Sequence, residues 1–184
     1  MGYSFHANFF GYLASMLVSE GVLKWVIRFY PPLLFQRVWV IRFYKEFRGV
    51  EVKISKSFLN KNSHKSIFGG TIYAAADPFH PLLFYNILSR KGYNVRAWTR
   101  SSAIRYHKPA HSNLHFKIII SDKEISICEE QLNLTGKFRK SYLVEIFDKN
   151  DKLCAAVINE IYIRDLNHPG AAEVIEPGEL EKLK

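Results

Sequence analysis

Alternating apolar and polar positions predict most of the strands in this chain. Val50, Val52 and Ile54 alternate with polar residues, which is typical of a strand with one buried face over 50–58. Longer segments rich in β-branched and aromatic residues predict four more strands. These strands cover residues 95–106, 113–121, 137–148 and 152–164, and a turn of Asp-Lys-Asn-Asp joins the last two.

Helical spacing dominates the N-terminal part and one later segment. Apolar residues in 7–30 recur at helical spacing and predict one or two amphipathic helices. A Pro-Pro pair must interrupt them, so a second helix is expected over roughly 33–47. The hexapeptide Trp-Val-Ile-Arg-Phe-Tyr occurs twice, starting at residues 25 and 39, and both copies fall in these predicted helices. A later run over 72–88 is apolar and rich in alanine, which indicates a buried helix.

Together these elements predict an α+β fold. Because the buried helix is apolar on nearly every face, an antiparallel sheet of about five strands must wrap around it. Pro78 can bend or restart this helix, and a short helix is expected over 122–132. The main domain would span 48–165, after an N-terminal helical extension over 1–47 and before an acidic, peripheral tail over 166–184.

The start of the central helix carries the candidate chemistry. Gly69-Gly70 exposes backbone N–H groups at the positive end of a helix dipole, where they could hold a carbonyl oxygen that becomes negative. Asp77 lies two helical turns further on and shares a face with Gly70. A carboxylate among Ala and Phe makes a useful base. Two simpler interpretations stay open: the glycines form a plain turn, and Asp77 caps a second helix over 78–90.

The spacing of this segment resembles that of hot-dog thioesterases of the phenylacetate-pathway type. That family carries Asn-x5-His-Gly-Gly-x6-Asp, and Asn62, Phe68, Gly69, Gly70 and Asp77 stand at the same spacing here. The sequence Ile-Arg-Tyr-His-Lys-Pro, which ends at residue 109, resembles the family's strand that ends in an apolar-x-aromatic-x-x-Pro turn. The segment Phe-Gly-Gly followed by Ala-Ala-Ala-Asp-Pro is closest to an uncharacterised, thioesterase-like branch of the superfamily.

The resemblance implies a hot-dog fold and hydrolysis of a thioester of coenzyme A or of an acyl carrier. Asp77 would be the nucleophile or general base, and the Gly70 N–H would hold the oxyanion. Asn62 would position water or the thioester, beside a substrate-binding turn formed by Phe68 and Gly69. The active site would form at an interface in a homodimer or a dimer of dimers, with no metal or redox cofactor.

Phe68 departs from the family pattern, because it stands where the family has His. Phenylalanine can neither donate nor accept a proton. This change favours an alternative function, a non-catalytic module that binds acyl-CoA or lipid. It also weighs against the hot-dog dehydratases, which depend on a His.

Positive charge is concentrated in the first two thirds of the chain and suggests an anionic partner. The net charge is +9, and residues 51–110 hold ten Lys and Arg against two acidic residues. Arg96, Arg100, Arg105 and Lys108 lie on one predicted strand and its turn. They could bind the phosphates of coenzyme A or simply form a solvated sheet edge. Trp98 among them fits a nucleic-acid groove, but no nucleic-acid-binding motif accompanies it, so no nucleic-acid partner is expected.

Other features place the protein in the cytoplasm. Phe9 to Val18 is apolar apart from Ser15 but shorter than the ~20 residues that a spanning helix needs. The first eight residues contain no Lys or Arg, so a secretory signal is not indicated. The two cysteines form no disulfide framework or zinc site. The paired histidines at 111 and 115 have no acidic ligand nearby, and those at 64 and 80 are expected to have surface or packing roles.

Aromatic and basic residues alternate in the N-terminal part. Trp25, Phe29, Trp39 and Phe43 are interspersed with six Lys and Arg between residues 22 and 48. This composition occurs in helices that lie on membranes, which allows a loose, peripheral contact with anionic lipids. In the alternative, these aromatic side chains pack on the sheet or cover the acyl pocket.

Overall fold

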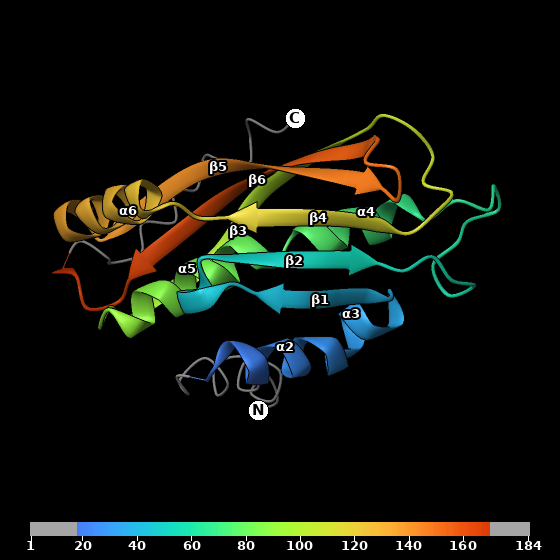
Figure 1. Ribbon diagram of the computed structural model, residues 1–184. Helices are drawn as coiled ribbons and strands as arrows, with labels where there is room; N and C mark the ends of the chain where they lie inside the picture. Colours follow the sequence, from blue (N-terminus) through green and yellow to red (C-terminus); the bar gives the residue numbers. More distant parts are fainter. Residues whose placement is uncertain (1–17, 170–184) are drawn as a thin grey trace, which may run out of the picture.

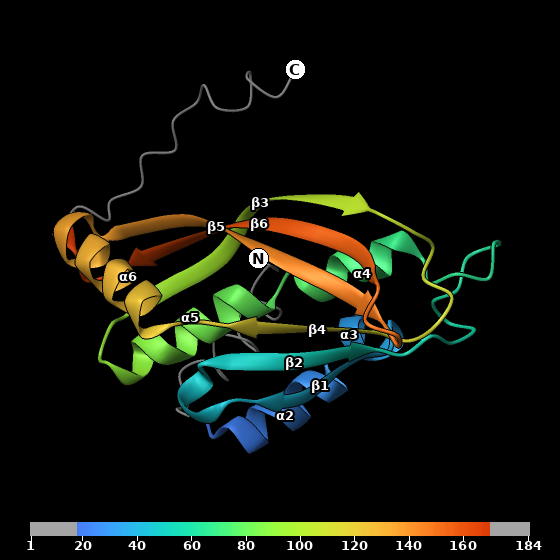
Figure 2. The ribbon, with the colours of Figure 1, turned by 45° about the horizontal axis from the view of Figure 1, so that its top comes forward.

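The computed structural model describes residues 18–169 and shows a six-stranded antiparallel sheet curved around two central helices (Figures 1 and 2). The strand order is β1-β2-β4-β5-β6-β3. The strands are β1 (Val38–Phe43), β2 (Gly49–Ile54), β3 (Val95–Tyr106), β4 (Leu114–Ile119), β5 (Lys137–Asp148) and β6 (Leu153–Asp165). The helices are α2 (Glu20–Phe29), α3 (Pro31–Phe35), η1 (Lys45–Phe47), α4 (Gly69–Ala76), α5 (Phe79–Arg90) and α6 (Asp122–Thr135).

The α+β fold and the five predicted strands are confirmed, and the sheet has a sixth strand that was not expected. The helix predicted over 33–47 is wrong, because most of this segment forms α3 and β1. In β1 the second copy of the hexapeptide pairs with β2, with Val40 opposite Val52. The first copy lies in α2, whose N-cap Ser19 accepts a hydrogen bond from Val22 N–H. Residues 7–17 of the first predicted helix and most of the acidic tail lie outside the described residues.

The central helical segment is broken into α4 and α5, as Pro78 allows. Alternate residues of the strands point inward and enclose both helices. Phe79, Leu83 and Phe84 of α5 are fully buried, and Phe79 meets Phe116 of β4 edge to face at 5.9 Å. The sheet therefore wraps around the apolar helix, as its sequence requires.

The two halves of the sheet meet along a short seam between β4 and β5. Only two residue pairs align there, Leu114 with Asp148 and His115 with Phe147. By contrast, β5 and β6 align over most of their length. Helix α6 connects β4 to β5 beyond this seam (Figure 1).

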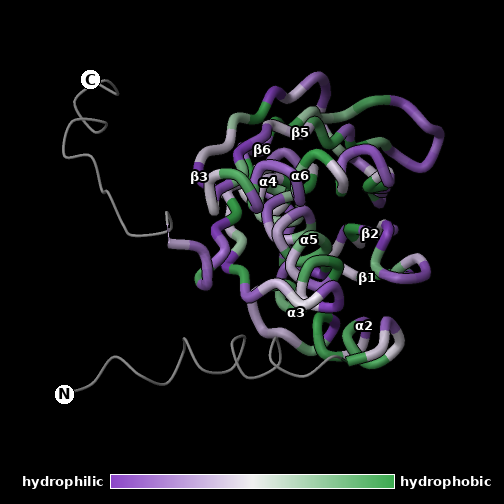
Figure 3. Tube along the Cα trace, turned by 90° about the vertical axis from the view of Figure 1, so that its left-hand side faces the viewer, coloured by the Kyte–Doolittle hydropathy of each residue, from purple (hydrophilic) through white to green (hydrophobic). Residues whose placement is uncertain are grey.

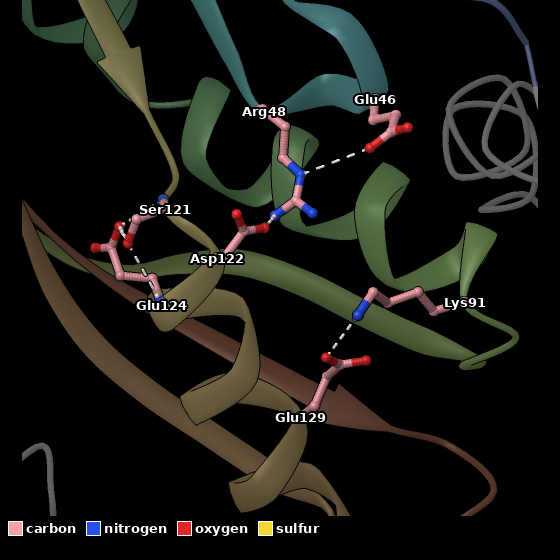
Figure 4. Close-up of polar contacts among 7 residues, drawn as sticks. All are labelled: Glu46, Arg48, Lys91, Ser121, Asp122, Glu124 and Glu129. Atoms are coloured by element: carbon pink, nitrogen blue, oxygen red, sulfur yellow. Dashed lines mark hydrogen bonds and ion pairs between the residues drawn. The ribbon is translucent and has the colours of Figure 1, made fainter.

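Polar contacts fix α6 against the rest of the domain (Figure 4). The helix begins with a capping box, in which Ser121 and Glu124 exchange hydrogen bonds. It ends at Gly136, which has the left-handed conformation common at this position. Two ion pairs of 2.7 Å join α6 to the segment before β2 and to the end of α5: Arg48–Asp122 and Lys91–Glu129.

The two edges of the sheet differ. Helix α2 packs along β1 with Leu23 and Ile27 buried, and Arg28 Nε donates a 2.9 Å hydrogen bond to the carbonyl oxygen of Val40. At the opposite edge, β3 pairs with β6 on one side, and no described strand pairs with its other side. An open strand of twelve residues invites pairing with another chain.

His80 of α5 is a core residue. Its side chain is only 3% exposed, and its ring stacks on Tyr142 with the centroids 4.6 Å apart. Its Nδ1 atom has no hydrogen-bond partner in the described part of the chain. Burial lowers the pKa of His80 from 6.5 to about 4, with a smaller opposing effect of Glu124. The expected packing role is thus confirmed for His80.

This buried histidine predicts a loss of stability in mild acid. Between pH 6.5 and about 4 the unfolded chain binds a proton at His80 and the folded chain does not, so the free energy of unfolding falls as pH falls. Lowering the pH from 7 to 5 should cost about 2 kcal/mol through this group. His80→Phe keeps an aromatic ring against Tyr142 and should remove this loss in urea unfolding. The exposed control His64→Phe should keep it, and an unchanged profile in His80→Phe would contradict the assignment.

Candidate functional site

The start of α4 presents two backbone donors. Phe68 precedes the helix in an extended conformation, and its carbonyl oxygen accepts from Thr71 N–H at 3.0 Å. The N–H groups of Gly69 and Gly70 meet no acceptor within residues 18–169. Both glycines are partly exposed. The positive end of α4 therefore leaves two donors unpaired among the described residues. That they hold an oxyanion stays a prediction.

Two aromatic rings lie against these glycines. A side chain on Gly70 would collide with the ring of Phe68, which is 59% exposed. A Cβ atom on Gly69 would lie 2.8 Å from the hydroxyl oxygen of Tyr106, at the end of β3. Burial, and to a smaller extent Tyr73, raises the pKa of Tyr106, so its hydroxyl stays protonated at neutral pH. The sequence identified Tyr106 only as the aromatic residue of a turn.

Asp77 lies just beyond the other end of α4. Its carboxylate is exposed in the single chain, so the expected apolar surrounding is absent there. It has no hydrogen-bond or ion-pair partner among the described residues. Helix α5 begins at Phe79 without any side-chain capping bond, so the interpretation of Asp77 as its cap is wrong. Within residues 18–169 the Asp77 carboxylate therefore has no structural partner.

The sheet holds the break between α4 and α5 in place. Asn159 is fully buried, and its Nδ2 donates a 2.9 Å hydrogen bond to the carbonyl oxygen of Ala76. The hydroxyl of Ser102 donates to the other end of this amide. Thr99 Oγ1 donates to the carbonyl oxygen of Asp77 at 3.1 Å. These donors satisfy carbonyl groups that a helix leaves unpaired at its end.

None of these three polar side chains was predicted from the sequence to support the site. The signal in the sequence is an asparagine on the inner face of β6, where Val157 and Ile161 are both buried. Buried amides need partners, so an asparagine at such a position indicates a fixed hydrogen bond.

Gly70 and Asp77 of one chain lie at opposite ends of α4. Seven residues of helix span about 10 Å. A reacting carbonyl group must lie roughly 3 Å from both the nucleophile and the oxyanion donor. The two groups in one chain are therefore too far apart to act on the same carbonyl group.

Asn62 stabilises a turn. Its Oδ1 accepts hydrogen bonds from the backbone N–H groups of His64 and Ser66, at 3.0 and 3.1 Å. Its Nδ2 donates to the hydroxyl of Ser66 at 2.9 Å. No hydrogen bond joins Asn62 to α4 in the described structure. The position of Asn62 beside the thioester stays a prediction, and the hydrogen bonds of this side chain to its own turn do not favour it.

A second asparagine, Asn60, supports the start of α4. It is buried, and its Nδ2 donates to the carbonyl oxygens of Gln36 and Ser55, at 2.8 and 3.0 Å. Its own carbonyl oxygen accepts from Phe68 N–H at 2.7 Å. Asn60 therefore connects the N-cap of α4 to the loop that precedes it.

The four predicted phosphate-binding residues do not form one cluster. Arg96 and Arg105 lie near opposite ends of β3, about 30 Å apart along an extended strand. Arg100 lies at an irregularity in the pairing of β3 with β6. Lys108 is ion-paired with Asp148 at 2.6 Å, and this contact, with backbone hydrogen bonds, lowers the pKa of Asp148 to about 2.

His111 and His115 form no metal site among the described residues. His115 lies 3.1 Å from Asp151, and no group of three metal-ligating side chains is found in the described part of the chain.

Comparisons with solved structures identify the fold. A probable thioesterase of unknown function from Pseudomonas aeruginosa aligns with a TM-score of 0.70 and 13% identity, over 79% of this chain and 95% of that chain. A thioesterase from Haemophilus influenzae aligns with a TM-score of 0.60 and 11% identity, over 83% of this chain and 94% of that chain. The PaaI protein of the phenylacetic acid degradation operon of E. coli aligns with a TM-score of 0.50 and 13% identity, over 78% of this chain and 95% of that chain. The predicted hot-dog fold is thus confirmed. Sequence identities this low do not show which function the chain has.

Sequence comparisons identify the family. No curated protein matches the chain. A family model described as a domain of unknown function, DUF4442, matches residues 40–163. The match begins within β1 and ends within β6, so it covers every strand of the sheet at least in part. Since this match covers more than half of the chain, the protein belongs to the DUF4442 family, and its domain has the hot-dog fold.

Proposed function

We propose that this protein hydrolyses thioesters of coenzyme A or of an acyl carrier, in a site built from two copies of the chain. The observation that carries the proposal is the exposed carboxylate of Asp77, which has no partner in the part of the chain that the structure describes and is held at a break in the central helix. The unpaired N–H groups at the start of α4 supply the second requirement, a site for a developing oxyanion. Relatives in fold are named as thioesterases, which supports the reaction class.

In the proposed reaction, Asp77 either attacks the thioester carbonyl carbon or takes a proton from the attacking water. The carbonyl oxygen becomes negative and accepts a hydrogen bond from Gly70 N–H. The C–S bond then breaks, and the thiolate takes up a proton to leave as a free thiol. If Asp77 is the nucleophile, water hydrolyses the resulting anhydride and regenerates the carboxylate.

The open edge of β3 provides the route to a two-chain site. Helix α4 runs alongside β3, with its Asp77 end held by Thr99 and its Gly69 end against Tyr106. If two β3 strands pair antiparallel about a twofold axis, the Thr99 end of one strand lies towards the Tyr106 end of the other. This brings Asp77 of one chain towards Gly70 of its partner. We therefore propose a homodimer, or a dimer of dimers, as the active form.

Tyr106 is proposed to replace the histidine that is absent at position 68. Its protonated hydroxyl lies beside Gly69 and can donate a further hydrogen bond to the substrate oxygen. Phe68 would then contact the acyl group or the pantetheine arm. Arg96, Arg100 and Arg105 remain candidates for binding the phosphates of coenzyme A, each at a separate point.

A second candidate function is a module that binds acyl-CoA or lipid without hydrolysing it. The observation that favours it is Phe68, whose ring lies beside Gly70 and cannot transfer a proton.

The two-chain site predicts complementation between inactive variants. Asp77→Asn should lose roughly 100- to 10,000-fold in turnover. Gly70→Pro should lose turnover because it removes the oxyanion donor. The first helical turn tolerates proline, although the exposed ring of Phe68 must move aside for the new side chain. Heterodimers isolated with two affinity tags from co-expressed Asp77→Asn and Gly70→Pro chains contain one site with both groups intact. Their release of thiol from acyl-CoAs of two to sixteen carbons should therefore recover.

The matched control pairs wild type with the double variant Asp77→Asn/Gly70→Pro, which leaves one defect in each site and should be nearly inactive. If the wild type paired with the double variant is active and the two single variants together are not, the site lies within one chain. Light scattering should give at least twice the mass of one chain, 21.4 kDa. A wild-type protein that binds acyl-CoA without releasing thiol would establish the binding module instead.

The proposed role of Tyr106 predicts a dependence on residue 68. Tyr106→Phe should lower turnover about tenfold, because it removes one donor to a developing charge. Phe68→His should leave turnover unchanged or raise it. In the Phe68→His background the effect of Tyr106→Phe should shrink, since the histidine can donate instead. Equal turnover of Tyr106→Phe and wild type would remove Tyr106 from the mechanism.

The buried contact of Asn159 predicts a positioning effect. Asn159→Leu leaves the Ala76 carbonyl unpaired in the core and should cost about 1–3 kcal/mol of stability. Because Asp77 is displaced while the substrate-binding surface is retained, kcat should fall more than KM rises. Thr99→Val should have a smaller effect of the same kind, and Thr99→Ser, which keeps the hydroxyl, should have none. Unaltered kinetics in a folded Asn159→Leu protein would show that the contact is only structural.

A further inference from the structure

Helix α2 exposes an apolar row on the side that faces away from the sheet. Val22, Trp25 and Phe29 are 51%, 54% and 67% exposed, and their spacing of three and four residues places them on one face. The opposite face is also apolar, with Leu23 and Ile27 buried against β1. The expected packing of these aromatic side chains on the sheet is therefore wrong for Trp25 and Phe29. Figure 3 shows α2 at the outer margin of the domain, next to β1.

These exposed side chains form a continuous patch. The rings of Trp25 and Phe29 stack with their centroids 6.1 Å apart. Val26, Tyr30 and Pro31 join them around a shallow hollow of about 360 Å³. The following helix α3 also exposes a large aromatic side chain, Phe35, which is 66% exposed.

Cations surround the patch. Lys24 Nζ and Arg28 Cζ lie 6.0 and 5.0 Å from the centroid of the Trp25 ring. Glu20, the one acidic residue of α2, accepts a hydrogen bond from the backbone N–H of Glu46 at 2.9 Å. Lys45, in the turn after β1, is exposed as well. The patch therefore combines an aromatic centre with a positive rim.

We propose that this face of α2 binds the surface of anionic membranes, with Trp25 and Phe29 inserted between the headgroups. Tryptophan and phenylalanine on one helical face with Lys and Arg beside them are the features of a helix that lies in the membrane interface. Near the surface, each cation gains further binding free energy from the negative potential of the lipids. Within residues 18–169 no helix is long and apolar enough to cross a membrane, so the contact is peripheral.

A second copy of the chain fits this face less well than a lipid surface does. The patch is formed by a few side chains, whereas stable protein interfaces use about 20–30 residues a side. It also lies beside β1, at the opposite edge of the sheet from β3. A dimer formed through β3 would thus leave both copies of the patch exposed.

Co-sedimentation with vesicles tests this proposal. The full chain should sediment with vesicles of three parts phosphatidylcholine to one part phosphatidylglycerol at low salt, and less at 0.5 M salt. Trp25→Ser/Phe29→Ser should lower the partition coefficient about tenfold or more. Lys24→Gln should lower it roughly fivefold. The control Phe58→Ser/Leu134→Ser removes two even more exposed apolar side chains elsewhere and should leave it unchanged.

Tryptophan fluorescence gives an independent readout. Insertion should shift the emission to shorter wavelength in wild type, and Trp25→Phe should keep binding but lose most of the shift. Thiol release in solution should not change in any of these variants, so failure here would leave the proposed hydrolysis intact. The proposal is overturned if wild type stays in the supernatant, or if the double variant sediments equally. Equal binding to pure phosphatidylcholine, or an altered mass of the double variant in light scattering, would also overturn it.

Discussion

A helix that ends inside a hydrophobic core imposes the constraint on which the rest of this structure depends. Helix α4 stops at Ala76, which is fully buried although the next residue, Asp77, is exposed, and the last carbonyl groups of the helix must find donors. The sheet supplies one from the buried amide of Asn159 and another from the hydroxyl of Thr99. These bonds fix the distance between the helix break and the β3 edge. The exposed position of Asp77 is therefore a consequence of hydrogen bonding in the core.

The sheet closes one of its edges and leaves the other open. Helix α2 covers β1, and Arg28 donates a hydrogen bond to a backbone carbonyl oxygen of that strand. Strand β3 carries no such cover in the described chain, although it is among the longest strands. The ends of α4 lie about 10 Å apart, which is too far for both to act on one carbonyl group. The open edge of β3 offers a place where a second chain could pair. In the hydrolysis proposed above, Asp77 and Gly70 would come together when two chains share this edge.

The sequence predicts the strands well because alternation of β-branched and apolar residues is itself the condition for a half-buried strand. It fails at β1 because the hexapeptide that begins at Trp25 is helical and the copy that begins at Trp39 is a strand. Identical residues adopt two structures because pairing with β2 and a helix N-cap at Ser19 decide between them. The spacing of Gly70 and Asp77 was recognisable as a motif. The polar side chains that hold it, such as Asn159, were not, because their partners are distant in sequence.

The seam between β4 and β5 has a mechanical consequence. A continuous ladder resists bending because every bend strains its hydrogen bonds, whereas this seam contains two aligned residue pairs. Beyond them the two halves of the sheet are joined through helix α5, whose Phe79 packs against Phe116 of β4 and whose His80 stacks on Tyr142 of β5. Rings can slide past one another at less cost than ladder bonds can break. We therefore expect the sheet to bend most easily along this line, where the fewest ladder hydrogen bonds resist it.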